Sequence, residues 1–233
     1  MTQGADIYRL QSLDTERDSK QSRLTEVKAG LRDDKALMQA RQAQASAQAL
    51  VQKYSTRQQD QELEIQGVSA KNSRSEQRLY SGAVKNPKEL TDLQAEIASL
   101  RRRRQKLEDD LLETMIEQEE AEAAHAQAQQ HLDETQTNWE NRQADLSAEQ
   151  EILQEKLVEI EQARNRVLPN IEADNLDIYQ NLRLRKGGLA AAPMNGIACG
   201  VCGMAVSPNL KWRIREEGMG HCSNCERIIV YIK

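Results

Sequence analysis

The chain has 233 residues, of which 30% are charged and 3% aromatic, with no phenylalanine and a formal net charge of −5. Because aromatic side chains contribute the largest areas to protein cores, this composition excludes a thick globular core. The low counts of proline (4) and glycine (11), with abundant alanine, leucine, glutamine and charged residues, argue against disorder and favour long helices.

The N-terminal sequence MTQGADIYRLQSLDTERD lacks the apolar segment of a secretory signal, and no run of about 18 apolar residues occurs in the chain. We therefore expect a soluble, cytoplasmic protein without a membrane partner. In such a chain, four cysteines confined to one short segment favour a metal site over disulfides.

Residues 5–79 have a helical composition. The first half of this segment carries an apolar stripe made of Ile7, Leu10, Leu24, Val27, Leu31 and Met38. The stripe loses its phase in the middle of the segment, so the sequence predicts a helix here without defining its register.

The segment LYSGAVKNPKEL predicts a tight turn between two helices. Ser81 and Gly82 end the first helix, and Asn86, Pro87 and Glu89 suit the N-cap, first and third positions of the second. So short a connection makes the two helices antiparallel neighbours. Separate intermolecular coiled coils are the alternative explanation of the helical pattern.

From Leu90 to Leu153, residues on one face recur at alternating spacings of three and four, the 3.5-residue period typical of a left-handed coiled coil. Setting Leu79 opposite Leu90 gives a register in which Ile7 opposes Gln162, with arms of about 75 residues, or ~110 Å.

The same register sets the alanine-rich segments 36–50 and 119–133 face to face. Facing alanines let helices approach closely but bury little apolar area. We therefore expect a thin, weakly held waist in this part of the hairpin.

After Pro169, the sequence IEADNLDIYQNLRLRKGG predicts a shorter third helix that stops at Gly187-Gly188. Its apolar side is expected to comprise Ile171, Ile178 and Leu182, and to fold back on the base of the hairpin. The expected domains are a hairpin at 1–168 (tip loop about 80–87), a third helix and linker at 169–190, and a cysteine domain at 191–233.

The cysteine domain contains two C-x2-C pairs separated by 19 residues, namely Cys199, Cys202, Cys222 and Cys225. This spacing matches a four-thiolate zinc site in which each pair lies on a tight turn. A domain of about 40 residues with few apolar groups cannot stabilise itself by burial, so the metal must supply that free energy. The expected cofactor is one structural Zn²⁺.

Two other cysteine chemistries are weaker. A rubredoxin-like iron site shares the ligand pattern but normally packs several aromatics, whereas this segment offers Trp212 and Tyr231. A thioredoxin-type redox pair needs a βαβ fold. Four ligands also close the coordination sphere, leaving no position for catalysis.

The segment RIIVYI is strand-like, whereas VSPNLKWRIREEGMG suits either a helix or a strand.

Charge is segregated along the chain. Residues 71–106 carry ten basic and four acidic side chains, residues 107–175 four and nineteen. The tip cations are candidate contacts for nucleic-acid phosphates or a protein partner: Lys71, Arg74, Arg78, Lys85, Lys88, Arg101, Arg102, Arg103 and Arg104. The competing interpretation is that the arginine run pairs with acidic residues across the hairpin.

The order of long helical hairpin, tip YSGAVKNPKEL, third helix, GG linker and CGVC…CSNC followed by an apolar strand resembles the bacterial C4-type zinc-ribbon coiled-coil family. The resemblance covers nearly the whole chain. It implies zinc at the four cysteines and a role in binding nucleic acid or proteins, in some bacteria connected with transcription and flagellar assembly. One departure is Glu226, where the family usually has glycine after the last cysteine.

The sequence thus predicts a mainly α protein: a long antiparallel coiled-coil hairpin with a small C-terminal β-rich zinc ribbon. We expect a non-enzymatic binding protein that engages nucleic acid or the transcription apparatus through its basic tip, its ribbon or both. The alternative is a structural protein–protein adaptor or chaperone, for example in secretion or flagellar assembly, that binds no nucleic acid. No small-molecule substrate is expected.

Overall fold

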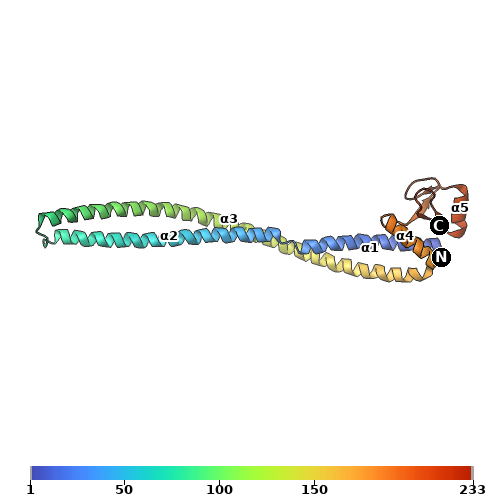
Figure 1. Ribbon diagram of the computed structural model, residues 1–233. Helices are drawn as coiled ribbons and strands as arrows, with labels where there is room; N and C mark the ends of the chain where they lie inside the picture. Colours follow the sequence, from blue (N-terminus) through green and yellow to red (C-terminus); the bar gives the residue numbers. More distant parts are fainter. Residues whose placement is uncertain (1, 232–233) are drawn as a thin grey trace. The chain divides into compact units, whose positions relative to one another are not determined.

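The computed structural model describes residues 2–231. As predicted, the fold is mainly α, with a long antiparallel helical hairpin followed by a small C-terminal sheet (Figure 1). The chain divides into two compact units, residues 1–33 with 142–233 and residues 34–141. Among the described residues, no helix combines the length and apolar character needed to cross a membrane.

Five α-helices, one short 3-10 helix and four strands make up the described chain. The helices are α1 (Gln3–Leu31), α2 (Lys35–Tyr80), α3 (Pro87–Val167), η1 (Leu168–Asn170), α4 (Ala173–Arg185) and α5 (Pro208–Glu217). The strands are β1 (Ala191–Asn195), β2 (Ala198–Cys199), β3 (Met219–His221) and β4 (Ile228–Val230).

In the unit of residues 34–141, α2 and the first part of α3 form the coiled coil that the heptad spacing predicts. Leu93, Ile97, Leu100 and Ala121 are buried on α3, and Val68 is buried on α2. Asn86 caps the N-terminus of α3 as expected, because the backbone N–H of Lys88 donates to Asn86 Oδ1 at 3.0 Å.

The alanine-rich segments also face one another, since Gln44 Nε2 lies 3.1 Å from His125 Nε2. We expect backbone amides of residues 40–50 and 119–130 to exchange with solvent at least tenfold faster than those of residues 93–100. The reason is that the waist buries less apolar area, and local opening costs correspondingly less. Hydrogen exchange followed by mass spectrometry measures this directly; equal protection in the two regions would contradict the expectation of a weak waist.

The composition of the first arm predicts one continuous helix, but in the structure this arm is interrupted between α1 and α2. The chain leaves helical geometry at Arg32 and resumes at Lys35. Gly30 and the Asp33-Asp34 pair explain the break, because glycine and aspartate are poor residues for a helix interior.

The predicted register fails beyond this break. Ile7 does not oppose Gln162 but lies in a buried cluster with Val167 and Ile171. The pairing of Arg23 with Glu149, with Nε and Oε1 2.7 Å apart, confirms that α1 and the last part of α3 are antiparallel. The non-helical residues between α1 and α2 change the spacing along the first arm, and this shifts the pairing of α1 with α3 in this unit.

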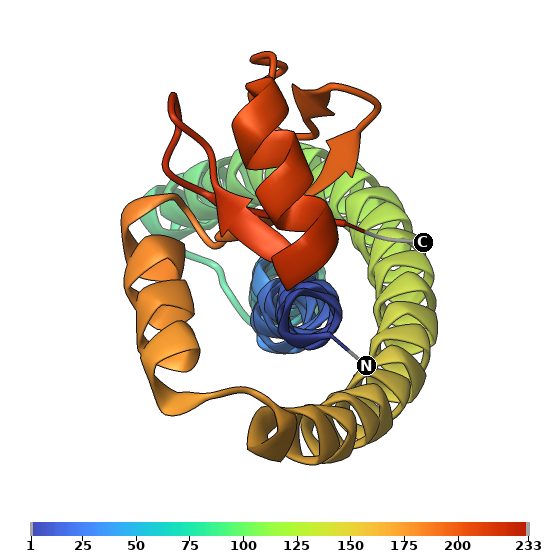
Figure 2. The same ribbon diagram turned by 90° about the vertical axis from the view of Figure 1, so that its right-hand side faces the viewer.

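In the unit of residues 1–33 and 142–233, the base of the hairpin and the C-terminal module share one core. α1, the end of α3, α4, β1 and β4 all contribute buried side chains to it. Figure 2 shows α4 and the strands arranged around the N-terminal end of α1. The members of this base core are Ile7, Leu10, Val167, Ile171, Tyr179, Leu182, Ala190, Ala191, Ile228 and Val230.

The helix predicted after Pro169 is present as α4, but its buried face differs from the prediction. Ile171 and Leu182 are buried as expected, whereas Ile178 is exposed and Tyr179 is buried in its place. The physical reason is a polar partner: the Tyr179 hydroxyl donates to Asp14 Oδ2 at 2.7 Å.

Asp14 is a buried carboxylate that connects three helices. It accepts a hydrogen bond from Arg164 Nε of α3 at 2.6 Å, and it pairs with Arg183 of α4. Burial alone would raise its pKa, but the Tyr179 hydrogen bond and the charges of Arg183 and Arg164 outweigh burial and hold the pKa below its usual value. Asp14 is therefore ionised at neutral pH.

The C-terminal sheet has the strand order β2-β1-β4-β3, with β1 parallel and β3 antiparallel to β4. Side chains alternate across β4: Ile228 and Val230 enter the base core, whereas Ile229 enters a second core beneath the cysteines. The ambiguous segment is a helix, α5, because Ser207 accepts from Leu210 N as N-cap and Gly218 ends it in the left-handed conformation.

Candidate metal centre and hairpin tip

The four cysteines lie on two loops with the same backbone geometry. In the first loop, the N–H of Gly203 donates to Cys199 O at 2.9 Å; in the second, the N–H of Glu226 donates to Cys222 O at 2.9 Å. Each loop thus folds its C-x2-C sequence into a tight turn that aims two sulfurs to one side.

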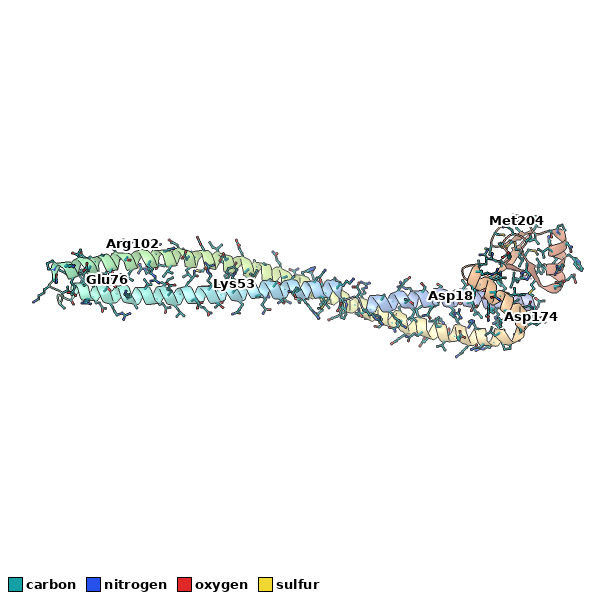
Figure 3. All side chains as sticks on the ribbon, viewed as in Figure 1. Asp18, Lys53, Glu76, Arg102, Asp174 and Met204 are labelled. Carbon is teal, nitrogen blue, oxygen red and sulfur yellow. The ribbon has the colours of Figure 1, made fainter. Side chains whose placement is uncertain are left out.

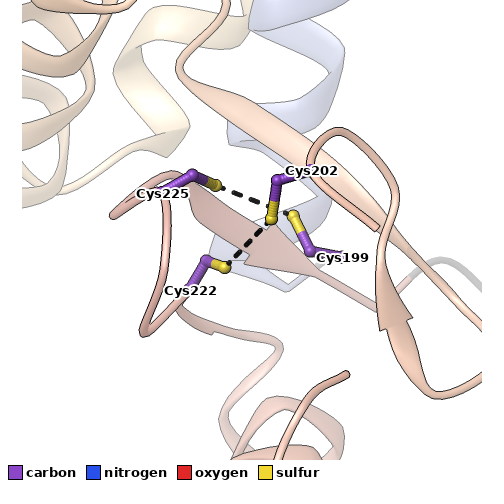
Figure 4. Close-up of side chains that lie close together, drawn as sticks. All are labelled: Cys199, Cys202, Cys222 and Cys225. Carbon is purple, nitrogen blue, oxygen red and sulfur yellow. Dashed lines mark hydrogen bonds between the residues drawn. The ribbon is translucent and has the colours of Figure 1, made fainter. Parts of the chain in front are cut away.

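The two loops face each other and bring all four sulfurs together (Figure 4). The Sγ atoms lie within 4.8 Å of one another, with Cys199 and Cys225 3.9 Å apart and Cys202 and Cys222 3.6 Å apart. All four are free cysteines. A tetrahedral ion with metal–sulfur bonds of about 2.3 Å separates its sulfurs by about 3.8 Å. The cluster therefore has the spacing of a tetrathiolate metal site.

The thiols of this cluster differ in acidity. Burial raises the pKa of Cys199 to about 11, whereas the backbone N–H of Met204 lowers the pKa of Cys202 to about 6. Since thiolates are the metal-binding form, uptake of a metal ion releases protons from this cluster.

Glu226 is the one non-glycine residue with positive φ among the described residues, at 66°. It occupies the position in the second loop that Gly203, with φ of 72°, occupies in the first. A side chain in this conformation costs about 1 kcal/mol relative to glycine. The glycine expected here from the family resemblance thus has a conformational reason, and Glu226 leaves the cysteine geometry intact.

A buried glutamine, which the sequence did not single out, forms hydrogen bonds with the backbone of the linker that leads to the cysteines. The Gln11 side chain donates to Gly188 O at 2.8 Å and accepts from the backbone N–H groups of Ala190, at 2.7 Å, and Ala191, at 3.1 Å. The chain is rich in glutamines, and nothing local distinguishes this one. Its role depends on the linker passing beside α1.

At the tip, five of the nine candidate cations form ion pairs within the hairpin. Lys71, Arg78, Arg101 and Arg103 reach across to the other arm, and Arg104 pairs along α3. Glu76 on α2 accepts from Arg101 at 2.7 Å. The competing interpretation, pairing across the hairpin, therefore holds for two of the four arginines of the run, Arg101 and Arg103.

The other four candidates, Arg74, Lys85, Lys88 and Arg102, are exposed and form no ion pair within residues 2–231. Arg74 donates to the carbonyl of Ala70 in its own helix. Figure 3 shows Arg102 on α3 near the tip, with Glu76 on the neighbouring arm. The available positive charge at the tip is thus smaller than the sequence count indicates.

These features define a class of protein: an antiparallel coiled-coil hairpin joined to a compact module with four converging cysteines. Residues 9–187 match the CT398-like coiled coil hairpin domain, and the chain belongs to this family.

Similar proteins occur in several bacteria. The uncharacterized protein Rv2229c of Mycobacterium tuberculosis is 32% identical over an alignment of 185 residues, and the match covers 74% of this chain and 71% of the relative. The structure of CT398 from Chlamydia trachomatis matches 99% of this chain and 98% of its own with a TM-score of 0.71 at 18% identity. A Mycobacterium smegmatis structure matches 100% of both chains with a TM-score of 0.75 at 23% identity. At these identities, the structures support the fold alone.

Proposed function

We propose that the four cysteines hold one structural Zn²⁺. The convergence of four sulfurs at tetrahedral spacing carries this proposal. Thiolates are soft donors that suit zinc, and four of them fill its coordination sphere, which assigns the ion a structural role. Metal analysis of protein purified without added metal, with X-ray absorption at the metal edge, tests the proposal; iron, or less than half an equivalent of zinc, would contradict it.

We further propose that the protein is a non-enzymatic adaptor that binds a protein partner along its hairpin. The observation that supports this is the exposure of large apolar side chains on α2 and α3 in residues 34–141, while most tip cations are used within the hairpin. Contiguous exposed apolar surface marks sites of protein interaction. The exposed large apolar residues of this unit are Met38, Leu50, Leu63, Tyr80, Leu112, Met115 and Ile116.

The test of the adaptor is affinity capture from extracts of the source organism with and without nuclease. A defined protein partner should be retained after nuclease treatment at near one-to-one stoichiometry. Loss of every partner on nuclease treatment would contradict the adaptor and favour nucleic acid as the ligand.

The second candidate function is nucleic-acid binding at the tip, which the four unpaired cations favour. Changing Arg74, Lys85, Lys88 and Arg102 to glutamine in one chain should weaken binding to duplex or single-stranded nucleic acid. It should also flatten the dependence of log affinity on log salt by about 0.7 to 0.9 for each phosphate that the variant no longer neutralises. Fluorescence anisotropy over a salt series measures both effects.

A matched control removes the same charge elsewhere, through glutamine at Arg9, Lys28, Lys35 and Arg41, none of which forms an ion pair among the described residues. This control should bind as the wild type does. An equal loss of affinity in both variants would show that net charge, and not the tip, attracts the polyanion.

A further inference from the structure

We propose that α3 carries a docking site for a basic amphipathic helix, formed by Leu112, Met115 and Ile116. This proposal rests on the adaptor function and specifies the chemistry of its partner. The three side chains are 59%, 40% and 58% exposed. Their spacing of three and four residues places them side by side on one face of the helix. We call this set the α3 stripe.

The hairpin itself does not cover the α3 stripe. At this level, the coiled-coil seam is occupied by Leu111 and Thr114, and Thr114 is fully buried with its hydroxyl bonded to Asp110 O at 3.0 Å. Met115 and Ile116 follow Thr114 directly and turn away from the seam. Three large apolar residues therefore form a second, unoccupied face on a helix that already has a partner.

Acidic residues surround the α3 stripe. Residues 107–122 contain eight acidic and no basic side chains. Glu113 and Glu120 lie one helical turn before and after Ile116, and Glu119 lies one turn after Met115. These three glutamates are exposed and form no ion pair with any residue from 2 to 231, whereas Glu117 pairs with Arg57 at 3.0 Å.

This arrangement selects the partner by charge. A second copy of the chain would bring like charges together around the apolar contact, which opposes self-association. A polyanion or an anionic membrane surface would be repelled. A helix with apolar residues at positions i, i+3, i+4 and i+7 and lysines or arginines beside them would bury the stripe and pair with the glutamates.

The experiment uses the full chain and a fluorescein-labelled 21-residue peptide of leucine and lysine, with leucines at i, i+3, i+4 and i+7. Fluorescence anisotropy should show saturable binding that weakens with salt. A peptide of the same composition with shuffled leucines should bind at least tenfold more weakly, and a leucine–glutamate peptide should not bind. Equal binding of the ordered and shuffled peptides would overturn the proposal.

The decisive variant changes Leu112, Met115 and Ile116 to glutamine, which keeps helix propensity. It should lose at least tenfold in affinity for the ordered peptide. A matched control changes Ile152, Val158 and Leu184, which are also exposed but lie outside residues 34–141, to glutamine and should bind as the wild type does. Unchanged binding by the stripe variant, or an equal loss of affinity in the control, would overturn the α3 stripe as the site.

Partner capture separates the failure of this proposal from that of the adaptor function. If the stripe variant captures the same partner from nuclease-treated extract as the wild type, the α3 stripe is overturned and the adaptor function stands. If the wild type itself retains no partner after nuclease treatment, the adaptor function fails.

Discussion

Replacing Cys222 by serine should abolish zinc binding and unfold the C-terminal module. Structural zinc contributes roughly 10–16 kcal/mol of apparent binding free energy to small domains, and the module has little to replace it. The core beneath the cysteines consists of six buried residues, two of which are cysteines themselves: Ala192, Cys199, Val206, Ile214, Cys222 and Ile229. The zinc-to-protein ratio should fall from near one to near zero.

In the Cys222→Ser chain, the loss of stability should extend from the C-terminal module into the base of the hairpin but not into residues 34–141. Ile228 and Val230 of β4 belong to the same core as Ile7 and Leu10 of α1. The rate of amide hydrogen exchange should therefore rise in residues 3–12 and in α4. In α2 and in residues 93–100 the amides should keep their wild-type protection. An exposed residue of the same loop, Ser223, supplies the control: Ser223→Ala should change neither zinc content nor exchange. A Cys222→Ser chain with one bound zinc and native protection would refute the structural role of the metal.

Local signals in the sequence predicted much of this fold. The three-four spacing from Leu90 locates the buried seam because each apolar position repeats the same local geometry. The tip was predictable for a similar reason, since Asn86 caps the helix that begins one residue later. The two C-x2-C pairs predicted the sulfur cluster because each loop is a short, self-contained turn.

Features that depend on distant pairing were not predictable. The break between Leu31 and Lys35 shifts the register of α1, and no residue pattern states how many residues a break absorbs. Likewise, the pairing of Arg101 and Arg103 with Glu76 and Glu64 follows from the register of the arms. Tyr179 is buried in place of Ile178 because Asp14, far away in the sequence, offers its hydroxyl a partner.

Replacing Asp14 by asparagine should destabilise the packing of α4 on α1 and α3 by about 3 kcal/mol, the lower end of the cost of breaking a buried ion pair. The change removes the carboxylate that two largely buried guanidinium groups share, and leaves Arg164 with Glu161 and Arg183 with Asp18, both half exposed. Arg164 and Arg183 expose 17% and 13% of their side chains and both pair with Asp14. Native-state hydrogen exchange of α4 gives this free energy. The control is Asp18→Asn: Asp18 also pairs with Arg183 but is half exposed, so its replacement should cost less than about 1 kcal/mol.

The contribution of Asp14 should also disappear in acid. Its pKa in the folded protein lies below the usual 3.8, although burial opposes this, because the Tyr179 hydroxyl and the charges of Arg183 and Arg164 favour the carboxylate. A carboxyl group with a lowered folded pKa stabilises fully above its unfolded pKa, and loses that contribution as the pH falls through its folded value. The difference in α4 stability between wild type and Asp14→Asn should thus be constant from pH 6 to 8 and shrink below about pH 4. Taking the difference cancels the effect of acid on the cysteine cluster, which both chains share. A difference that has already vanished at pH 6 would mean that the carboxylate of Asp14 is not what holds the three helices together.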